Sequence, residues 1–271
     1  IPATVKKLGY VITTGAFCGC SNLEEVVFLP AAQGDTVAPD LGCGTFKNLG
    51  NLTSVTLPTN LTALDKRVFY GCTSLEAITL PDTLVTLVDS VFYGCTSLET
   101  ITFSNALTTI GRNVFRDCTS LQTVTLPSGL ETLDYHAFDG CTGLESISLP
   151  GGITTVGDSV FLECSSLVSA TFQSPMEAVG PSMFRSCLKL KTVNLPEGLD
   201  TIGNQAFQNC TSLESITIPE TVTSVGDVAF SGCSSLGSVT FQGSLEALNN
   251  GMFTGCTSLT TIDLPSGLPT I

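Results

Sequence analysis

Apolar residues recur along this chain with a period of 23 residues, and a phenylalanine marks each repeat. Counted as position 0, this residue forms the series Phe46, Phe69, Phe92, Phe115, Phe138, Phe161, Phe184, Phe207, Phe230 and Phe253. Phe17 belongs to the same series, displaced by a six-residue insertion. Position 6 is always Leu, position 9 is Val or Ile except for Ala170, and positions 15 and 18 are apolar. A fixed period of this length indicates a solenoid.

The polar residues between these positions predict the elements of one repeat. In the repeat that follows Phe92, residues 98–103 alternate apolar and polar side chains around β-branched residues, which predicts a short strand. Position 12 is usually Pro, which ends the strand pairing because Pro has no N–H to donate. Residues 107–110 form a second extended piece, and residues 114–118 suggest a single helical or 3₁₀ turn. No repeat can bury its apolar side alone, so we expect the repeats to stack in parallel.

The repeated phrase Phe-x-x-Cys-x-x-Leu-x-x-Ile-x-Leu-Pro-x-x-Leu-x-x-Ile-Gly resembles the 23-residue, BspA-type subclass of the leucine-rich repeats. The resemblance covers the whole chain. It implies a β-rich solenoid, a right-handed coil with a parallel sheet on one face and short turns or 3₁₀ segments on the other. It also implies surface proteins of bacteria and protists that mediate adhesion or protein binding, with some intracellular members. It offers no catalytic residues to carry over to this sequence.

The unbroken repeat favours one elongated domain, residues 1–271, of about eleven repeats. The chain starts and stops partway through a repeat, so we expect it to be an excerpt of a longer array. Irregular insertions stand at residues 9–12 and 31–44, and the second carries Asp35 and Asp40. Such departures are where repeat scaffolds usually add specificity, although a tolerated surface loop explains them equally simply.

The balance of charge is acidic, with 10 Lys and Arg against 24 Asp and Glu. This balance argues against nucleic acid or an anionic membrane as the partner, because both need a basic face. The sequence has no apolar run long enough to cross a membrane, which argues against direct insertion by this segment.

Ten of the twelve cysteines stand at position 3 of their repeats. We expect these thiols to line an inner corner of the coil as small apolar groups, because stacked parallel side chains aim their sulfurs poorly for disulfides. Zinc binding is disfavoured, since the spacing gives no C-x-x-C pair and the chain has one His. Cys18 and Cys43 lie outside this ladder, and they form either a disulfide or two free thiols.

Catalytic chemistry finds no support in the sequence. His136 stands in a turn that elsewhere carries Arg, Ser or Gln, so an exposed surface His is the simplest interpretation. Asp134 is near it, but no Gly-x-Ser-x-Gly motif accompanies them. The glycines recur as turn residues, not as a phosphate-binding loop. We therefore predict that the protein is not an enzyme and carries no cofactor or metal.

Positions 8 and 10 of the predicted main strand form two outward ranks of mostly hydroxyl residues. The candidate binding-surface residues are Thr56, Thr79, Thr100, Thr102, Thr123, Thr125, Thr171, Thr192, Thr217 and Thr240. A solvated β surface explains the ranks, because Thr favours strands and pairs well with itself. A low-charge recognition face is the functional alternative. The ranks also resemble the flat faces of some ice-binding proteins, but Asn194 and Asp263 interrupt them.

Three sequons, at Asn51, Asn60 and Asn209, offer glycosylation sites if the protein is secreted by a eukaryote. The hypothesis that combines these observations is a non-enzymatic binding or adhesion array, extracellular or at the cell surface, with a protein or glycan ligand. The alternatives are a structural component in which solenoids of the same or neighbouring subunits stack, an ice-binding protein, and an intracellular scaffold.

Overall fold

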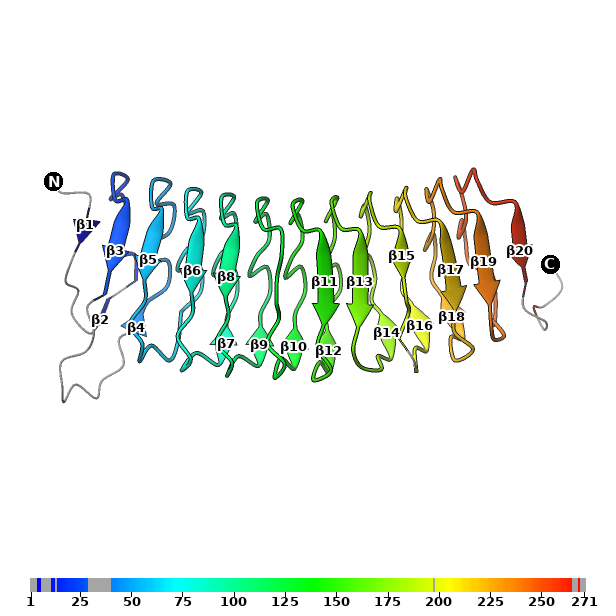
Figure 1. Ribbon diagram of the computed structural model, residues 1–271, viewed down its shortest axis with the longest axis horizontal. Coiled ribbons are helices and arrows are strands. Elements are labelled where there is room, and N and C mark those ends of the chain that lie inside the picture. The colour runs from blue at the N-terminus through cyan, green and yellow to red at the C-terminus, as the bar shows by residue number, and fades with distance from the viewer. Residues whose placement is uncertain are drawn as a thin grey trace.

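The computed structural model describes residues 4–5, 11–12, 14–28, 40–196, 198–264 and 268. The chain winds into a solenoid whose rungs lie side by side along the long axis, with β1 and β20 at opposite ends (Figure 1). Within the described residues every regular element is a strand, so the predicted β-rich solenoid is confirmed.

Each rung contributes up to two short strands. The main strands are β1 (Thr4–Val5), β3 (Glu25–Val27), β5 (Ser54–Thr56), β6 (Ala77–Thr79), β8 (Thr100–Thr102), β11 (Ser146–Leu149), β13 (Ser169–Phe172), β15 (Thr192–Val193), β17 (Ser215–Ile218), β19 (Ser238–Phe241) and β20 (Thr261–Asp263). The second strands are β2 (Val11–Ile12), β4 (Asp40–Leu41), β7 (Thr86–Leu87), β9 (Thr109–Ile110), β10 (Thr132–Leu133), β12 (Thr155–Val156), β14 (Ala178–Val179), β16 (Thr201–Ile202) and β18 (Ser224–Val225). The second strands form another row beside the main strands (Figure 1).

All strand pairs are parallel, and their register follows the sequence period. Ser146 pairs with Ser169 on the main face, and Thr132 pairs with Thr155 on the second, each 23 residues on. Between β3 and β5 the register advances from Glu25 to Ser54, because this rung contains the irregular segment. The extra residues are therefore accommodated without a slip in the pairing, and the inward positions stay inward.

The phenylalanines at position 0 form one continuous stack through the core. From Phe17 to Phe253, successive ring centroids lie 5.1–5.8 Å apart with interplanar angles of 1–16°. The nine rings from Phe46 to Phe230 are fully buried. These separations suit offset-stacked aromatic pairs, which add to the free energy of burying the rings.

The cysteines at position 3 have a role in the core beyond filling space. From Cys72 to Cys256, each Sγ donates to the carbonyl oxygen of the phenylalanine one repeat earlier, at 3.0–3.2 Å. Eight of these thiols are buried, as predicted, whereas Cys256 is half-buried and Cys20 is exposed. Burial raises the pKa of Cys72 to about 12, so the buried thiols stay protonated and can act as donors.

The segment around each phenylalanine is a pair of turns, not the helical or 3₁₀ turn that its sequence suggested. Positions −2 and 2 have positive φ in every repeat, including residues that are not glycine such as Glu163 (58°) and Val228 (50°). A residue with positive φ breaks a right-handed helix, so the chain reverses direction twice around each ring. A β-branched Val in this region is unusual and identifies the turn at Val228 as a strained one.

The main sheet opens wherever Pro stands at position 12 in two successive repeats. These pairs are Pro58 with Pro81, Pro127 with Pro150, and Pro196 with Pro219. In the first case, β5 and β6 share one residue pair. In the second, Thr123 and Ser146 form one isolated bridge. In the third, β15 and β17 share no pair. By contrast, Gln242 donates its N–H to Ile218 O at 3.0 Å, and it extends the ladder between β17 and β19 to four residue pairs. Each Pro at position 12 thus lacks the N–H that Gln173 and Gln242 donate to the preceding rung, and the two ladders that these Gln residues extend are the longest, with four pairs each.

Candidate functional site

The outward face of the main strands presents the predicted hydroxyl ranks to solvent. All ten candidate threonines are exposed, while the residues between them on the same strands point into the core. Strand pairing places several of them side by side across neighbouring rungs, as with Thr79 and Thr102 or Thr217 and Thr240. The exposure was predicted from sequence; the role of these residues in binding remains a prediction.

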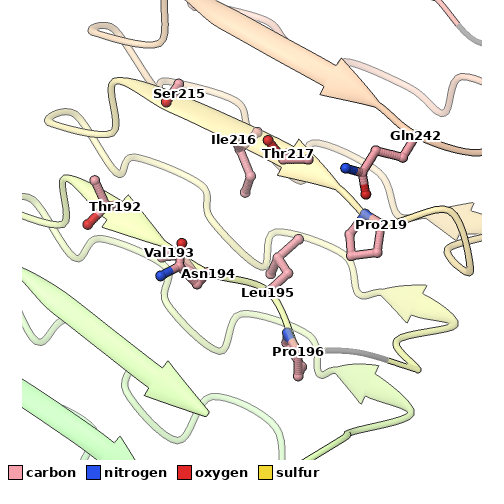
Figure 2. A pocket seen from close by; sticks show the side chains of 10 residues that line it. All are labelled: Thr192, Val193, Asn194, Leu195, Pro196, Ser215, Ile216, Thr217, Pro219 and Gln242. Atoms are coloured by element: carbon pink, nitrogen blue, oxygen red, sulfur yellow. The ribbon is translucent and has the colours of Figure 1, made fainter.

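A groove interrupts this face between β15 and β17, where no strand pair joins the two rungs in the described chain. It has a volume of about 330 Å³ and is lined by Thr192, Val193, Asn194, Leu195, Pro196, Ser215, Ile216, Thr217, Pro219 and Gln242. Figure 2 shows the side chains of the two rungs along the groove. Gln242, which follows β19, lies near Pro219. Pro196 and Pro219 both line this groove, and Pro219 lacks the N–H that could donate to the preceding rung across it.

The groove is uncharged, and half of its lining residues are polar. Thr192, Ser215 and Thr217 contribute hydroxyl groups, while Asn194 and Gln242 contribute amides. Hydroxyl and amide groups both donate and accept hydrogen bonds, so they can match a ligand rich in hydroxyl or peptide groups. The apolar half of the lining consists of Val193, Leu195, Pro196, Ile216 and Pro219. Asn194, which interrupts the threonine ranks, therefore lies at a feature of the face that the sequence pattern did not predict.

Two further grooves lie at other weak points in the strand ladders. One is lined by residues of β5 and β6, which share a single residue pair. The other lies between β12 and β14 on the second face, beside Pro175 and Met176. In this repeat Gln173 stands at position 12 and the proline is Pro175, so the shifted proline accompanies this opening.

The turn edge carries a second group of interacting side chains that sequence reasoning missed. At position 1 of successive repeats, Lys47 Nζ lies 5.2 Å from the Tyr70 ring centroid, and Tyr70 stacks on Tyr93 at 4.8 Å. Arg116 then lies over Tyr93 at 5.8 Å, and its Nε is 3.2 Å from Asp139 Oδ2. A comparison of position 1 across repeats would have shown these aromatic and charged residues in a row. Cations in such a row can form cation–π interactions with the neighbouring ring faces.

His136 belongs to this cluster and is not the exposed surface residue that we expected. Its side chain is half-buried, and its Nδ1 lies 3.0 Å from Oδ2 of Asp139. Burial raises the pKa of Asp139, and the charges of Arg116 and His136 partly oppose that shift. Although Arg116 Nε is at ion-pair distance from Asp139, its N–H makes no aligned hydrogen bond. Asp134, the other nearby carboxylate, pairs with Arg112 at 3.4 Å.

The remaining predicted site residues are scattered. Asp35 lies outside the described residues, and Asp40 is the first residue of β4. Cys18 is an exposed free thiol and Cys43 a half-buried one, so the structure does not form the disulfide between them. Asn51 is exposed and its Nδ2 donates to Ser21 O at 2.8 Å, Asn60 is half-buried, and Asn209 is exposed.

Among the described residues, no group of three or more His, Cys, Asp or Glu side chains is arranged to hold a metal ion. The described part of the chain contains no helix that is long and apolar enough to cross a membrane.

Comparison with known proteins identifies the class of protein. The family described as "BspA type Leucine rich repeat region (6 copies)" matches residues 1–84, 39–168, 85–213 and 177–271, so the chain belongs to the BspA-type leucine-rich repeat family. No curated protein sequence matches the chain.

Several solved structures are similar. A leucine-rich repeat protein from Bacteroides ovatus is 30% identical, with a TM-score of 0.80 over 97% of this chain and 71% of that one. A leucine-rich cell surface protein from Faecalibacterium prausnitzii is 25% identical, with a TM-score of 0.60 over 98% of this chain and 87% of that one. A leucine-rich repeat protein from T. pallidum is 26% identical, with a TM-score of 0.51 over 75% and 82% of the two chains.

Proposed function

We propose that this chain is a non-enzymatic binding segment of an extracellular or cell-surface protein, and that its ligand lies along the main strand face. The observation that carries the proposal is the groove between β15 and β17, where an uncharged surface with five hydroxyl or amide side chains opens on the strand face. The cell-surface description of the similar F. prausnitzii protein supports the location. The ligand would be a protein or a glycan held by many weak contacts along the face.

The described chemistry favours this function over the alternatives from the sequence. The buried thiols are protonated donors, so they do not supply a nucleophilic thiolate. An ice-binding face needs an extended flat lattice of hydroxyl groups. Here the pairing of the main strands is interrupted between β8 and β11 and again between β15 and β17.

The proposal is tested by placing a bulky side chain in the groove. Thr217→Tyr keeps a residue that favours strands and fills the groove beside Asn194 and Gln242. Thr102→Tyr makes the same change at the same repeat position but away from this groove. Both variants would be applied to an array of immobilised glycans and extracellular matrix proteins. We expect Thr217→Tyr to weaken binding to the ligands of the wild type by about tenfold, a loss of about 1.4 kcal/mol, and Thr102→Tyr to weaken it less.

Unchanged binding by both variants would place the ligand elsewhere and overturn the role of the strand face. The location is tested separately by antibody labelling of intact source cells. Labelling that requires permeabilised cells would overturn the extracellular placement.

A further inference from the structure

The repeat that begins at Phe184 departs from the others just before β15. Its positions 4 and 5 are Leu188 and Lys189, whereas every other repeat has Ser, Thr or Gly at position 4 and Ser, Asn or Gly at position 5. Position 7, most often Glu, is Lys191 here, and the preceding repeat has Val168 at that position. We call Val168, Leu188, Lys189 and Lys191 the Lys189 patch.

The side chains of this patch face solvent. Leu188 is 43% exposed and Val168 is 40% exposed, which places both among the most exposed large apolar residues of the described chain. Both lysines are also exposed. Their backbones are fixed by bonds to the preceding repeat, because Lys189 N donates to Ser165 O and Lys191 N donates to Val168 O. The patch is therefore an ordered surface at the start of β15. It adjoins the groove, because Lys191 directly precedes Thr192, which lines the groove.

Lys189 and Lys191 make none of the carboxylate or aromatic-ring contacts that most other Lys and Arg side chains of the described chain make. Lys47, Lys66, Arg112 and Arg116 each contact a carboxylate or a tyrosine ring. Among the described residues, Arg67, Arg185, Lys189 and Lys191 have neither an ion pair nor a contact with an aromatic ring, and three of these four lie within residues 185–191. Glu214 occupies position 7 one repeat after Lys191, but no ion pair joins them. Unpaired cations that are concentrated at one place in a chain of net charge −14 leave an unmet attraction for an anion.

From the patch and the groove together we infer that this part of the strand face binds an anionic polysaccharide, whose carboxylate or sulfate groups meet Lys189 and Lys191. The inference rests on the proposed function and specifies its ligand. The hydroxyl and amide groups of the groove match sugar hydroxyls, and the exposed Leu188 and Val168 can cover the C–H faces of the rings. A protein partner is less well matched, because interface hot spots are enriched in Trp and Tyr, and neither lines the groove or the patch.

The inference is tested with fluorescent polygalacturonate, a polymer of uronate units, and with dextran sulfate. Neutral dextran and poly-L-glutamate serve as comparators. The variant L188T/K189S/K191E restores the residues that other repeats carry, so it should fold as the wild type does. This variant should weaken the binding of polygalacturonate or dextran sulfate by about tenfold or more. The reason is that K189S removes one exposed positive charge and K191E replaces another by a negative charge. The variant K189R/K191R should retain binding, and binding by the wild type should weaken as salt rises.

The matched control is K66S/R112E, which removes one cation and reverses another, as the patch variant does, but at the turn edge, and it should leave binding unchanged. An equal loss in the control, or wild-type binding to poly-L-glutamate as tight as to the polysaccharides, would show general attraction of polyanions and overturn the inference. No binding of either anionic polysaccharide would overturn it as well. If Thr217→Tyr abolishes binding to array ligands while the patch variant does not, the proposed function stands and this inference fails.

Discussion

Replacement of Phe138 by Ala tests the physical basis of the solenoid most directly. The ring is fully buried, and it stacks between Phe115 at 5.1 Å and Phe161 at 5.8 Å. Loss of a buried Phe side chain costs about 3–5 kcal/mol through lost transfer free energy and the cavity left behind. Two aromatic pairs are also lost, each contributing about 0.5–1.5 kcal/mol beyond burial. We therefore expect a loss in the upper half of that range, about 4–5 kcal/mol.

Phe253→Ala provides an internal comparison with the same chemistry. This ring is half-buried, and among the described residues it stacks on Phe230 alone, at 5.7 Å. Because one side of the ring lacks an aromatic partner and less of its surface is buried, its removal should cost about half as much as the removal of Phe138.

The assay must resolve individual rungs, because a solenoid need not unfold as one cooperative unit. Urea unfolding followed by circular dichroism gives the total loss of stability, and native-state hydrogen exchange locates it. Protection should fall most for amides beside the cavity, such as Phe138 N, which donates to Val160 O. A loss below about 1 kcal/mol for Phe138→Ala, or an equal loss at Phe253, would refute the reasoning that the stack supports the core.

Three further predictions concern the buried polar groups and the thiols. Cys141→Ser keeps a donor to Phe115 O and should cost less than about 1 kcal/mol in urea unfolding, whereas Cys141→Val should cost about 1–3 kcal/mol by loss of this donor together with overpacking; equal costs would contradict a role for the hydrogen bond. Because burial raises the pKa of Asp139, its contribution to stability is present below the ordinary carboxyl pKa, about 3.9, and is lost as pH rises through the raised value. The wild type should therefore lose stability relative to Asp139→Asn above about pH 4, and a relative gain in urea midpoint would contradict this. Under native conditions, mass spectrometry should find that a maleimide labels Cys18, Cys20 and Cys43 first; labelling of Cys18 and Cys43 only after reduction would instead reveal a disulfide between them.

Much of the strand face could be predicted from the sequence, and part of the site could not. The alternation in residues 98–103 correctly predicted which side chains point outward, because successive side chains of a strand lie on opposite faces. Asn194 was noted as an interruption of the hydroxyl ranks, but the groove beside it was not expected. Pro219 lacks the N–H that could donate to Leu195 across this gap, as Gln242 N donates to Ile218 O between the next two rungs. Sequence reasoning considered each proline as the end of its own strand and missed its effect on the gap to the preceding rung.

The turn edge was predicted least well, for a related reason. His136 resembles an exposed turn residue when its own segment is considered alone. Its partner Asp139 is close in sequence, but Arg116, which completes the cluster, comes from the preceding repeat. The positive φ values at residues such as Arg67 and Glu163 are equally hidden, because these residue types do not favour that conformation. The closure of the coil imposes them.

The sequence alone determined the solenoid, its 23-residue register and the identity of the core positions. The sequence could do so because the same apolar positions recur in every repeat, and all of them are buried together only when the repeats stack in register. The tertiary structure decided which neighbouring rungs pair, which cations remain free of partners, and that the cysteine thiols donate across rungs. These properties depend on distances between residues of adjacent repeats, such as Cys141 and Phe115, and those distances are set only when the rungs stack.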